Sequence, residues 1–404
     1  MKYVIVLGDG MADEPIPELG GLTPLEYAKT PALDAMAPVS EIGLACTIPE
    51  GMSPGSDTAN LSVLGYDPRQ YYTGRSPLEA LSIGVDMKPD DVALRANLIT
   101  VSDGDEPYEE KTIIDHSSGE ISTEDAAVLL DAVRAELEDD IYHFYVGTSY
   151  RHLLIWEKGS VVPLTPPHDV LGQKTGAYLP ADEKLLEMQK RSYEILSRHP
   201  INLERKKKGL NPANSCWFWG AGTRPALVSF EEKNGKKGAM ISAVDLLKGI
   251  AAGAGMTNIQ VEGANGQLHT NYEGKARAAA DALLKDGFDF VYVHVEAPDE
   301  MGHQGSWERK VQSIEYLDQR LIKHLKEALD ASGEPYRMMV LPDHPTPIRV
   351  RTHTSDPVPF LLYDSTKTQN GQDVYSEKAA RESGLTVSRG CELIDRLFEK
   401  TEIR

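Results

Sequence analysis

Short, unbroken apolar runs alternate along the chain with longer segments whose apolar residues have helical spacing. Runs of β-branched and aromatic residues predict buried strands of a parallel sheet. These runs lie at residues 3–7, 238–244, 288–295, 337–341 and 358–363. Helical spacing follows at residues 31–37, 123–137, 183–197, 246–251 and 311–329. Because strands and helices alternate, the pattern predicts an α/β fold.

The run at 288–295 ends at Pro298, and an acid and an imidazole follow it. Asp299 and His303 are four residues apart, so one helical turn would direct both side chains to the same point. A carboxylate and an imidazole at the carboxyl end of a strand are typical ligands of a divalent metal. Taken alone, the pair favours a capping Asp and a surface His over a metal site.

Two other predicted strands end in the same way. The strand at 337–341 precedes Asp343 and His344, with His353 nine residues beyond His344. The first strand precedes Asp9, whose flanking glycines allow a sharp turn that exposes the carboxylate. With Asp299 and His303, the chain thus offers six oxygen or nitrogen donors, which suffice for two metal ions if a seventh residue bridges or completes the set.

Ser56 follows a Pro-Gly turn and begins a segment of helical character that ends at Gly65. Free backbone N–H groups and the helix dipole favour an anion at such a terminus. The local sequence favours a plain N-terminal cap. Beside six candidate metal ligands, the residue also suits a nucleophile that attacks a phosphate or sulfate ester.

The middle of the chain has a different character, because no strand there ends in Asp. It contains a helix at 123–137, a strand pair at 142–146 and 152–156, and a helix near 183–197. We therefore predict a catalytic domain formed by residues 1–100 and 214–404, interrupted by a smaller α+β domain at 101–213.

Composition narrows the classes of partner. The chain has 404 residues, enough for two domains, and a formal net charge of −20, which disfavours nucleic acid and anionic membranes as main partners. A small anionic substrate remains compatible, since metals and basic side chains reverse the field within a cleft. Three widely spaced cysteines, the absence of a signal-peptide pattern and no apolar run of membrane length predict a cytoplasmic protein. No feature of the sequence indicates an oligomeric state.

The motifs, taken in order, resemble those of the alkaline phosphatase superfamily. Within it they are most similar to the cofactor-independent (2,3-bisphosphoglycerate-independent) phosphoglycerate mutases of the shorter, archaeal type. The matching segments are 8–11, 54–57, 64–68, 72–75, 270–275, 298–303, 343–344 and 353–360. Each segment alone is weakly specific, but the ordered set is highly specific.

The resemblance implies a doubly wound, alkaline-phosphatase-like sheet sandwiched by helices, with an inserted cap that selects the substrate. It also implies two divalent ions, with Mn²⁺ expected and Mg²⁺ or Zn²⁺ as alternatives. By position, one ion would be bound by Asp299, His303 and His353. The other would be bound by Asp9, Ser56, Asp343 and His344.

The implied activity is interconversion of 2-phosphoglycerate and 3-phosphoglycerate, a step of glycolysis and gluconeogenesis, through phosphorylated Ser56. Candidate ligands for the substrate's carboxylate and phosphate are the basic residues Arg151, His168, Arg224 and Lys275. The main alternative is a kinase or phosphotransferase acting on another small hydroxy acid or amino acid such as homoserine, although the chain lacks a Gly-x-x-x-x-Gly-Lys-Ser/Thr motif. A phosphatase and a metal-stabilised binding protein without turnover are further alternatives.

Overall fold

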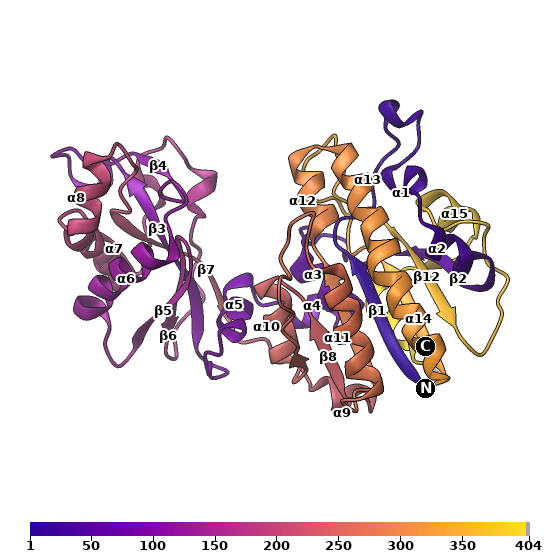
Figure 1. Cartoon of the computed structure of the whole chain (residues 1–404). Helices are drawn as coiled ribbons and strands as arrows, with labels where there is room; N and C mark the ends of the chain where they lie inside the picture. The colour runs from indigo at the N-terminus through magenta and orange to yellow at the C-terminus, as the bar shows by residue number, and fades with distance from the viewer. Residues whose placement is uncertain (401–404) are drawn as a thin grey trace. The chain divides into compact units, whose positions relative to one another are not determined.

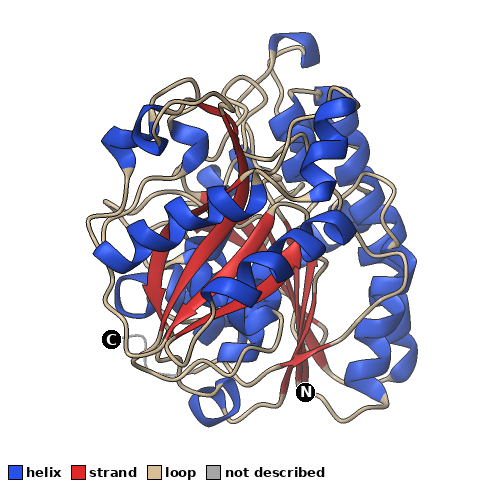
Figure 2. Cartoon of the chain, turned by 90° about the vertical axis from the view of Figure 1, so that its left-hand side faces the viewer, coloured by secondary structure: helices blue, strands red, loops and turns tan. Residues whose placement is uncertain are grey.

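The computed structural model describes residues 1–400 and divides the chain into two units. Unit 1 is formed by residues 1–72 together with the chain from residue 227 onward, and unit 2 by residues 73–226. Helices and strands are both plentiful (Figure 2), which confirms the α/β fold class. Among the described residues, no helix is both long enough and apolar enough to cross a membrane.

Unit 1 contains an eight-stranded sheet in the order β13-β2-β12-β11-β1-β10-β8-β9. Its strands are β1 (Lys2–Gly8), β2 (Glu41–Ala45), β8 (Gly238–Ile241), β9 (Thr257–Asn258), β10 (Phe290–Val295), β11 (Tyr336–Leu341), β12 (Val358–Asp364) and β13 (Thr386–Val387). The central strand β1 is parallel to both of its neighbours, β10 and β11, and β12 is the strand that runs antiparallel to β11. The predicted parallel core is therefore present.

Helices cover both faces of this sheet, as in a doubly wound fold. On one face, α11 (Tyr272–Leu284), α13 (Trp307–Tyr316) and α14 (Lys323–Ser332) pack on alternate strand residues such as Val4 and Val293 (Figure 1). On the other face, Tyr3 and Phe290 make edge-to-face contacts with Phe398. Short elements complete unit 1: η1 (Pro17–Leu19), α1 (Pro24–Tyr27), α2 (Pro31–Met36), η2 (Ala37–Val39), α3 (Ser56–Val63), α4 (Pro68–Tyr71), α9 (Phe230–Asn234), α10 (Asp245–Gly253), α12 (Ala297–Gln304), α15 (Glu377–Glu382), η7 (Gly390–Glu392) and α16 (Leu393–Leu397).

The long helix predicted at 311–329 is interrupted by a π-helical turn, η6 (Leu317–Ile322). Within this turn, the Asp318 carboxylate accepts hydrogen bonds from the backbone N–H groups of Ala32 (3.0 Å) and Leu33 (2.8 Å). These N–H groups begin α2, whose own N-cap residue provides no side-chain hydrogen bond. Burial raises the pKa of Asp318 to about 6. The widened turn thus lets one helix cap another that lies far away in the sequence.

Unit 2 is built on a five-stranded antiparallel sheet, as expected for an α+β insert. Its central strand pairs with three others, β4, β6 and β7. The elements are α5 (Arg75–Ser82), β3 (Val92–Val101), η3 (Tyr108–Glu110), β4 (Ile113–Asp115), α6 (Thr123–Leu137), β5 (Tyr142–Thr148), β6 (Arg151–Trp156), η4 (Pro167–Asp169), η5 (Thr175–Tyr178), α7 (Glu183–Leu196), α8 (Pro200–Lys207) and β7 (Ser215–Thr223). Leucines of α6 and α7 pack with β3 and β6 in one hydrophobic core.

The structure corrects the predicted domain boundaries of 1–100, 101–213 and 214–404. The second unit extends from 73 to 226, because β3 and β7, which were assigned to the first domain, are hydrogen-bonded to each other within the antiparallel sheet. Most residues of β3 are apolar and all ten are buried, so this strand resembles a strand of a parallel sheet although it contains Arg95 and Asn97.

The two ends of the insert are tied together inside unit 2. The Thr73 hydroxyl donates to the carbonyl oxygen of Thr223, and the Ser76 hydroxyl donates to that of Gly220, each at 2.6 Å. Unit 1 has a corresponding link between the chain segments that flank the insert, where the Tyr66 hydroxyl donates to the carbonyl oxygen of Val228 at 2.8 Å.

A lysine on α13 forms a buried ion pair in unit 1. Lys310 is inaccessible to solvent, and its ammonium group lies 2.8 Å from Asp13 Oδ2 and 2.9 Å from the carbonyl oxygen of Thr346. Removing one partner of a buried ion pair leaves the other charge uncompensated, so we expect Lys310→Met to lower the free energy of unfolding by about 3–5 kcal/mol. Urea unfolding measures this loss. The matched Lys326→Met change breaks a partly exposed pair with Asp330 and should cost roughly 0.5 kcal/mol or less; equal losses would contradict the prediction.

Candidate active site

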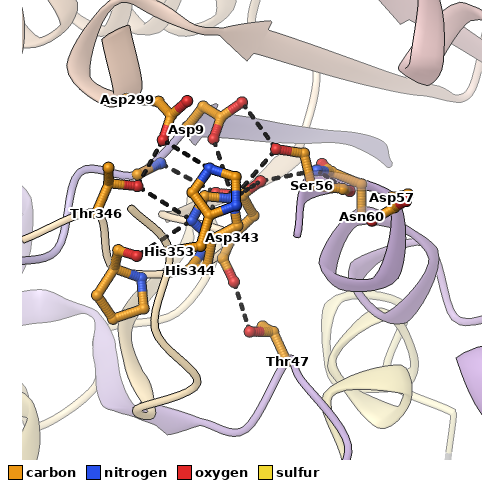
Figure 3. Close-up of polar contacts among 12 residues, drawn as sticks. Asp9, Thr47, Ser56, Asp57, Asn60, Asp299, Asp343, His344, Thr346 and His353 are labelled. Carbon is orange, nitrogen blue, oxygen red and sulfur yellow. Dashed lines mark hydrogen bonds and ion pairs between the residues drawn. The ribbon is translucent and has the colours of Figure 1, made fainter. Parts of the chain in front are cut away.

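The predicted acidic and imidazole residues meet at one edge of the unit 1 sheet. Asp9 follows β1, Asp299 lies in α12 just after β10, and Asp343 and His344 follow β11. Because β1 pairs in parallel with both β10 and β11, the carboxyl ends of these strands are adjacent. Figure 3 shows the side chains of these residues turned toward one another, with His353 and Ser56 beside them.

Asp299, His303 and His353 form the first cluster. His303 Nε2 lies 3.1 Å from Asp299 Oδ2 and 3.1 Å from His353 Nε2. His353 Nε2 lies 3.3 Å from Asp299 Oδ1. The helical turn predicted for the 299/303 pair is present, since both residues belong to α12. The three side chains thus present one potential ligand atom each to a common point.

Asp9, Ser56, Asp343 and His344 form the second cluster. Ser56 is the first residue of α3, and its Oγ lies 3.1 Å from His344 Nε2 and 3.4 Å from Asp9 Oδ2. His344 Nε2 in turn lies 3.5 Å from an oxygen of Asp9 and 3.5 Å from an oxygen of Asp343. The hydroxyl group at the helix N-terminus is therefore in direct contact with candidate metal ligands.

Gly10 allows the backbone to pass close to both clusters. It has a φ of +59°, and a Cβ atom there would lie 2.5 Å from Thr346 Oγ1 and 2.6 Å from Asp299 Oδ1. Its N–H donates to Asp343 Oδ1 at 3.1 Å. A side chain at this position would therefore collide with Asp299 of the first cluster and with Thr346, which explains the glycine that follows Asp9.

Three further residues hydrogen-bond to the candidate ligands and were not predicted from the sequence. Asn60 Nδ2 donates to Asp343 Oδ2 at 2.9 Å and to the carbonyl oxygen of Ser56 at 2.7 Å. The Thr346 hydroxyl donates to Asp299 Oδ1 at 2.5 Å. His294 Nε2 lies 2.9 Å from Asp9 Oδ2.

A sequence signal existed for His294 but not for the others. It is an imidazole near the carboxyl end of the apolar strand β10, where burial lowers its pKa to about 3 and therefore keeps it neutral. Asn60 and Thr346 lie in a helix and a loop, where such residues are common.

The charges at the site are suited to divalent cations. Burial raises the pKa of Asp9 well above its usual value, and the nearby carboxylates of Asp343 and Asp299 raise it further. Burial also opposes ionisation of Asp299, but hydrogen bonds from His303 and His353 outweigh it and lower this pKa well below its usual value. Cations would relieve the repulsion among three buried carboxylates, and mixed oxygen and nitrogen donors suit Mn²⁺ or Zn²⁺.

Comparison with known proteins identifies the family. The sequence profile of 2,3-bisphosphoglycerate-independent phosphoglycerate mutase matches residues 37–202. A protein of that name from Methanosarcina barkeri is 48% identical to this chain, over 98% of each chain. The chain belongs to this mutase family. The family predicted from the motifs is therefore confirmed.

Two solved structures agree with the membership in the mutase family. A cofactor-independent phosphoglycerate mutase from Thermoplasma acidophilum aligns over the whole of both chains with a TM-score of 0.68 and 29% identity. A protein from Pyrococcus horikoshii aligns over 100% of this chain and 98% of its own, with a TM-score of 0.82 and 30% identity. The observed fold is thus shared with a cofactor-independent phosphoglycerate mutase.

Three of the four basic residues predicted to bind substrate lie in unit 2 of this mutase-family chain. The guanidinium of Arg151 packs over the ring of Tyr150 at 5.1 Å. The Tyr150 ring contacts that of His116, which in turn contacts His168. Arg151 and His168, both exposed, are thus connected by a series of ring contacts.

The other two basic residues are placed apart from this series. Arg224 Nη1 donates to the carbonyl oxygen of Met87 at 2.9 Å. Lys275 lies in unit 1 within α11, is inaccessible to solvent, and donates from Nζ to the carbonyl oxygen of His294 at 2.7 Å. Contact of Lys275 with substrate stays a prediction.

We expect the affinity for a divalent metal to depend on pH, because protons and the metal compete for His303. The hydrogen bond with Asp299 raises the pKa of His303 to about 9 in the metal-free protein. A metal ligand must give up that proton, so the apparent affinity for Mn²⁺ should rise with pH by up to about tenfold per unit and level off above pH 9. Calorimetric titration of metal-free protein in buffers of different ionisation enthalpy measures the released proton. An affinity that is constant between pH 6.5 and pH 9 would contradict the assignment.

Proposed function

We propose that this chain interconverts 2-phosphoglycerate and 3-phosphoglycerate through a phosphoserine at Ser56. The observation that carries the proposal is the position of Ser56 Oγ, at the N-terminus of α3 and within 3.4 Å of both His344 Nε2 and Asp9 Oδ2. A nucleophile in this position is suited to phosphoryl transfer, because the helix N-terminus offers free N–H groups to a phosphate. Its full-length similarity to proteins named as mutases supports the choice of substrate.

Two divalent cations, Mn²⁺ in first place and Mg²⁺ or Zn²⁺ as alternatives, complete the proposed site. One ion would be bound by Asp299, His303 and His353. The other would be bound by Asp9, Ser56, Asp343 and His344. The short distances and the crowded carboxylates support a shared metal centre. The division between the two ions follows the family resemblance, since a ligand atom of His344 also lies within 4.8 Å of ligand atoms of Asp299 and His353. Such cations supply positive charge that stabilises the attacking and leaving oxygens of an in-line displacement.

In the proposed reaction, Ser56 Oγ forms a bond to phosphorus while the bond from phosphorus to one glycerate oxygen breaks. Asp9 Oδ2, 3.4 Å from Ser56 Oγ, is the acceptor within reach of the serine proton, and the released glycerate oxygen takes up a proton. The glycerate then turns within the site. Its other hydroxyl group attacks the phosphoserine, which restores Ser56 and yields the isomer.

We further propose that unit 2 is the cap that recognises the substrate and excludes water from the phosphoserine. The connected side chains of Arg151 and His168 supply a cation and an imidazole suited to a carboxylate or phosphate. Arg224 stays a third candidate. Since the reaction belongs to glycolysis and gluconeogenesis, we place it in the cytoplasm.

An enolase-coupled assay tests the proposal directly. Purified protein loaded with Mn²⁺ is given 3-phosphoglycerate in the absence of 2,3-bisphosphoglycerate, and formation of phosphoenolpyruvate is followed. Turnover that is unaffected by adding 2,3-bisphosphoglycerate is the expected result. A parallel reaction contains homoserine and a nucleoside triphosphate. Product in that reaction alone would replace the mutase by a phosphotransferase at the same site.

A further inference from the structure

His294 is a buried imidazole at the active site that metal ligation and phosphoryl transfer do not by themselves require. It is the next-to-last residue of β10, is inaccessible to solvent, and points to the same side of the sheet as Tyr292, whose hydroxyl group donates to Asn60 of α3. Its two ring nitrogens contact two different side chains. Nε2 lies 2.9 Å from Asp9 Oδ2, and Nδ1 lies 3.2 Å from Ser242 Oγ.

The contact with Asp9 determines which nitrogen carries the proton. An ionised carboxylate can only accept hydrogen bonds, so His294 Nε2 donates to Asp9 Oδ2 and carries the single proton of the neutral imidazole. Nδ1 then accepts from the Ser242 hydroxyl group, whose oxygen also accepts from the backbone N–H of Val244 at 3.0 Å.

This arrangement makes the two oxygens of Asp9 unequal. Oδ2 accepts from His294 and from the Ser56 hydroxyl group. Oδ1 is buried and, among the residues that the structure describes, has no hydrogen-bond partner. It lies 3.5 Å from His344 Nε2, on the side of the second cluster of candidate ligands.

The same hydrogen bonds argue against His294 as a metal ligand. Asp9, His294 and Asp343 each place one potential ligand atom within 4.8 Å of those of the other two, an arrangement that resembles a metal site. However, Nδ1 accepts from Ser242 and Nε2 carries the proton, so neither nitrogen has a free lone pair for a cation.

We propose that His294 is a positioning residue, which occupies Oδ2 of Asp9 and leaves Oδ1 as the oxygen available to the cation bound with Ser56. The proposal rests on the metal centre assigned above. Residues that hydrogen-bond to a ligating carboxylate fix its orientation, and their loss weakens metal binding by about 10- to 100-fold. Ser242 acts one step further away, because its hydroxyl group donates to Nδ1 and so supports this tautomer of His294.

Two substitutions of similar length separate this hydrogen bond from packing. In His294→Gln the side-chain amide retains an N–H near the position of Nε2, whereas His294→Met fills a similar volume without a donor. Metal-free proteins are titrated with Mn²⁺ by calorimetry and by electron paramagnetic resonance, which report stoichiometry and affinity without turnover. We expect His294→Met to weaken one of two sites by about 10- to 100-fold and His294→Gln to weaken it by less than about threefold.

Ser242→Ala should weaken the same site by a smaller factor, since it leaves His294 in place but releases its tautomer. His152→Leu is the control. His152 is equally buried but lies in unit 2, so both Mn²⁺ affinities should match the wild type. Circular dichroism of the metal-free variants reports whether each one folds.

The outcomes distinguish this inference from the proposed function. If wild type binds two ions and folded His294→Met binds both as tightly, the role of His294 is refuted. If wild type binds no divalent ion, the metal centre itself is refuted. If His294→Met does not fold, Ser242→Ala decides, because unchanged affinity in that variant contradicts control of the tautomer.

Discussion

Ser56→Ala is expected to abolish turnover, with a loss of about 10⁴-fold or more in kcat, because the variant lacks the oxygen that accepts the phosphoryl group. The enolase-coupled assay measures the loss, and mass spectrometry of acid-quenched enzyme detects phosphate on the peptide that contains Ser56. Wild type should carry the phosphate and the variant should not. Circular dichroism should be unchanged, since the Ser56 hydroxyl group provides no cap to α3.

A nearby serine provides the control. Ser53 is exposed and lies in the same loop, so Ser53→Ala should retain the activity of the wild type. Substantial turnover by Ser56→Ala would mean that the phosphoryl group passes directly between substrate hydroxyl groups, and the covalent mechanism would then be wrong.

Removal of divalent metal is expected to have the second-largest effect. Dialysis against a chelator should lower activity by about a hundredfold or more, since the cations contribute several kcal/mol to stabilising charge in the transition state. Added Mn²⁺ should restore it. The melting temperature should rise with Mn²⁺ concentration, because a ligand that binds only the folded protein stabilises it.

Asp299→Asn tests whether the effects of Mn²⁺ arise from binding at the first cluster or elsewhere on the protein. Asp299 contacts both histidines of the first cluster, so its loss should remove one of the two bound ions and weaken the increase in melting temperature. An unchanged response to Mn²⁺ in this variant would place the metal elsewhere, as would full activity after exhaustive chelation.

Three strands of the unit 1 sheet, and the acidic residues that follow them, were predictable from the sequence. β1, β10 and β11 were recognisable because their apolar runs are bounded by glycine, proline and aspartate, and strands of one parallel sheet bring their carboxyl ends together. The meeting of Asp9, Asp299, Asp343 and His344 follows from this topology, whereas Ser56 begins α3 and His353 lies in a loop. Their pairing with individual ions did not follow from the pattern and depended on the family resemblance.

Features that depend on tertiary partners were not predictable in the same way. A strand such as β3 that is buried on both faces has the same sequence pattern in either type of sheet, so the domain boundary was misplaced. The partners of His294, at residues 9 and 242, are distant in sequence, and nothing near residue 294 indicates them. Likewise, the π-helical turn reflects the need of Asp318 to reach α2, which helical periodicity does not reveal.

The tied ends of the insert have an evolutionary consequence. The chain passes between the two units twice, near residues 72 and 227. Within each unit, a hydrogen bond connects the two chain segments next to these points, so neither unit needs the other to hold these segments together. A module of this kind can be lengthened, replaced or recombined without redirecting the strands that carry the metal ligands. Under the function proposed above, exchange of residues 73–226 alone would change the substrate preference, while the strands that carry the candidate metal ligands stay in place.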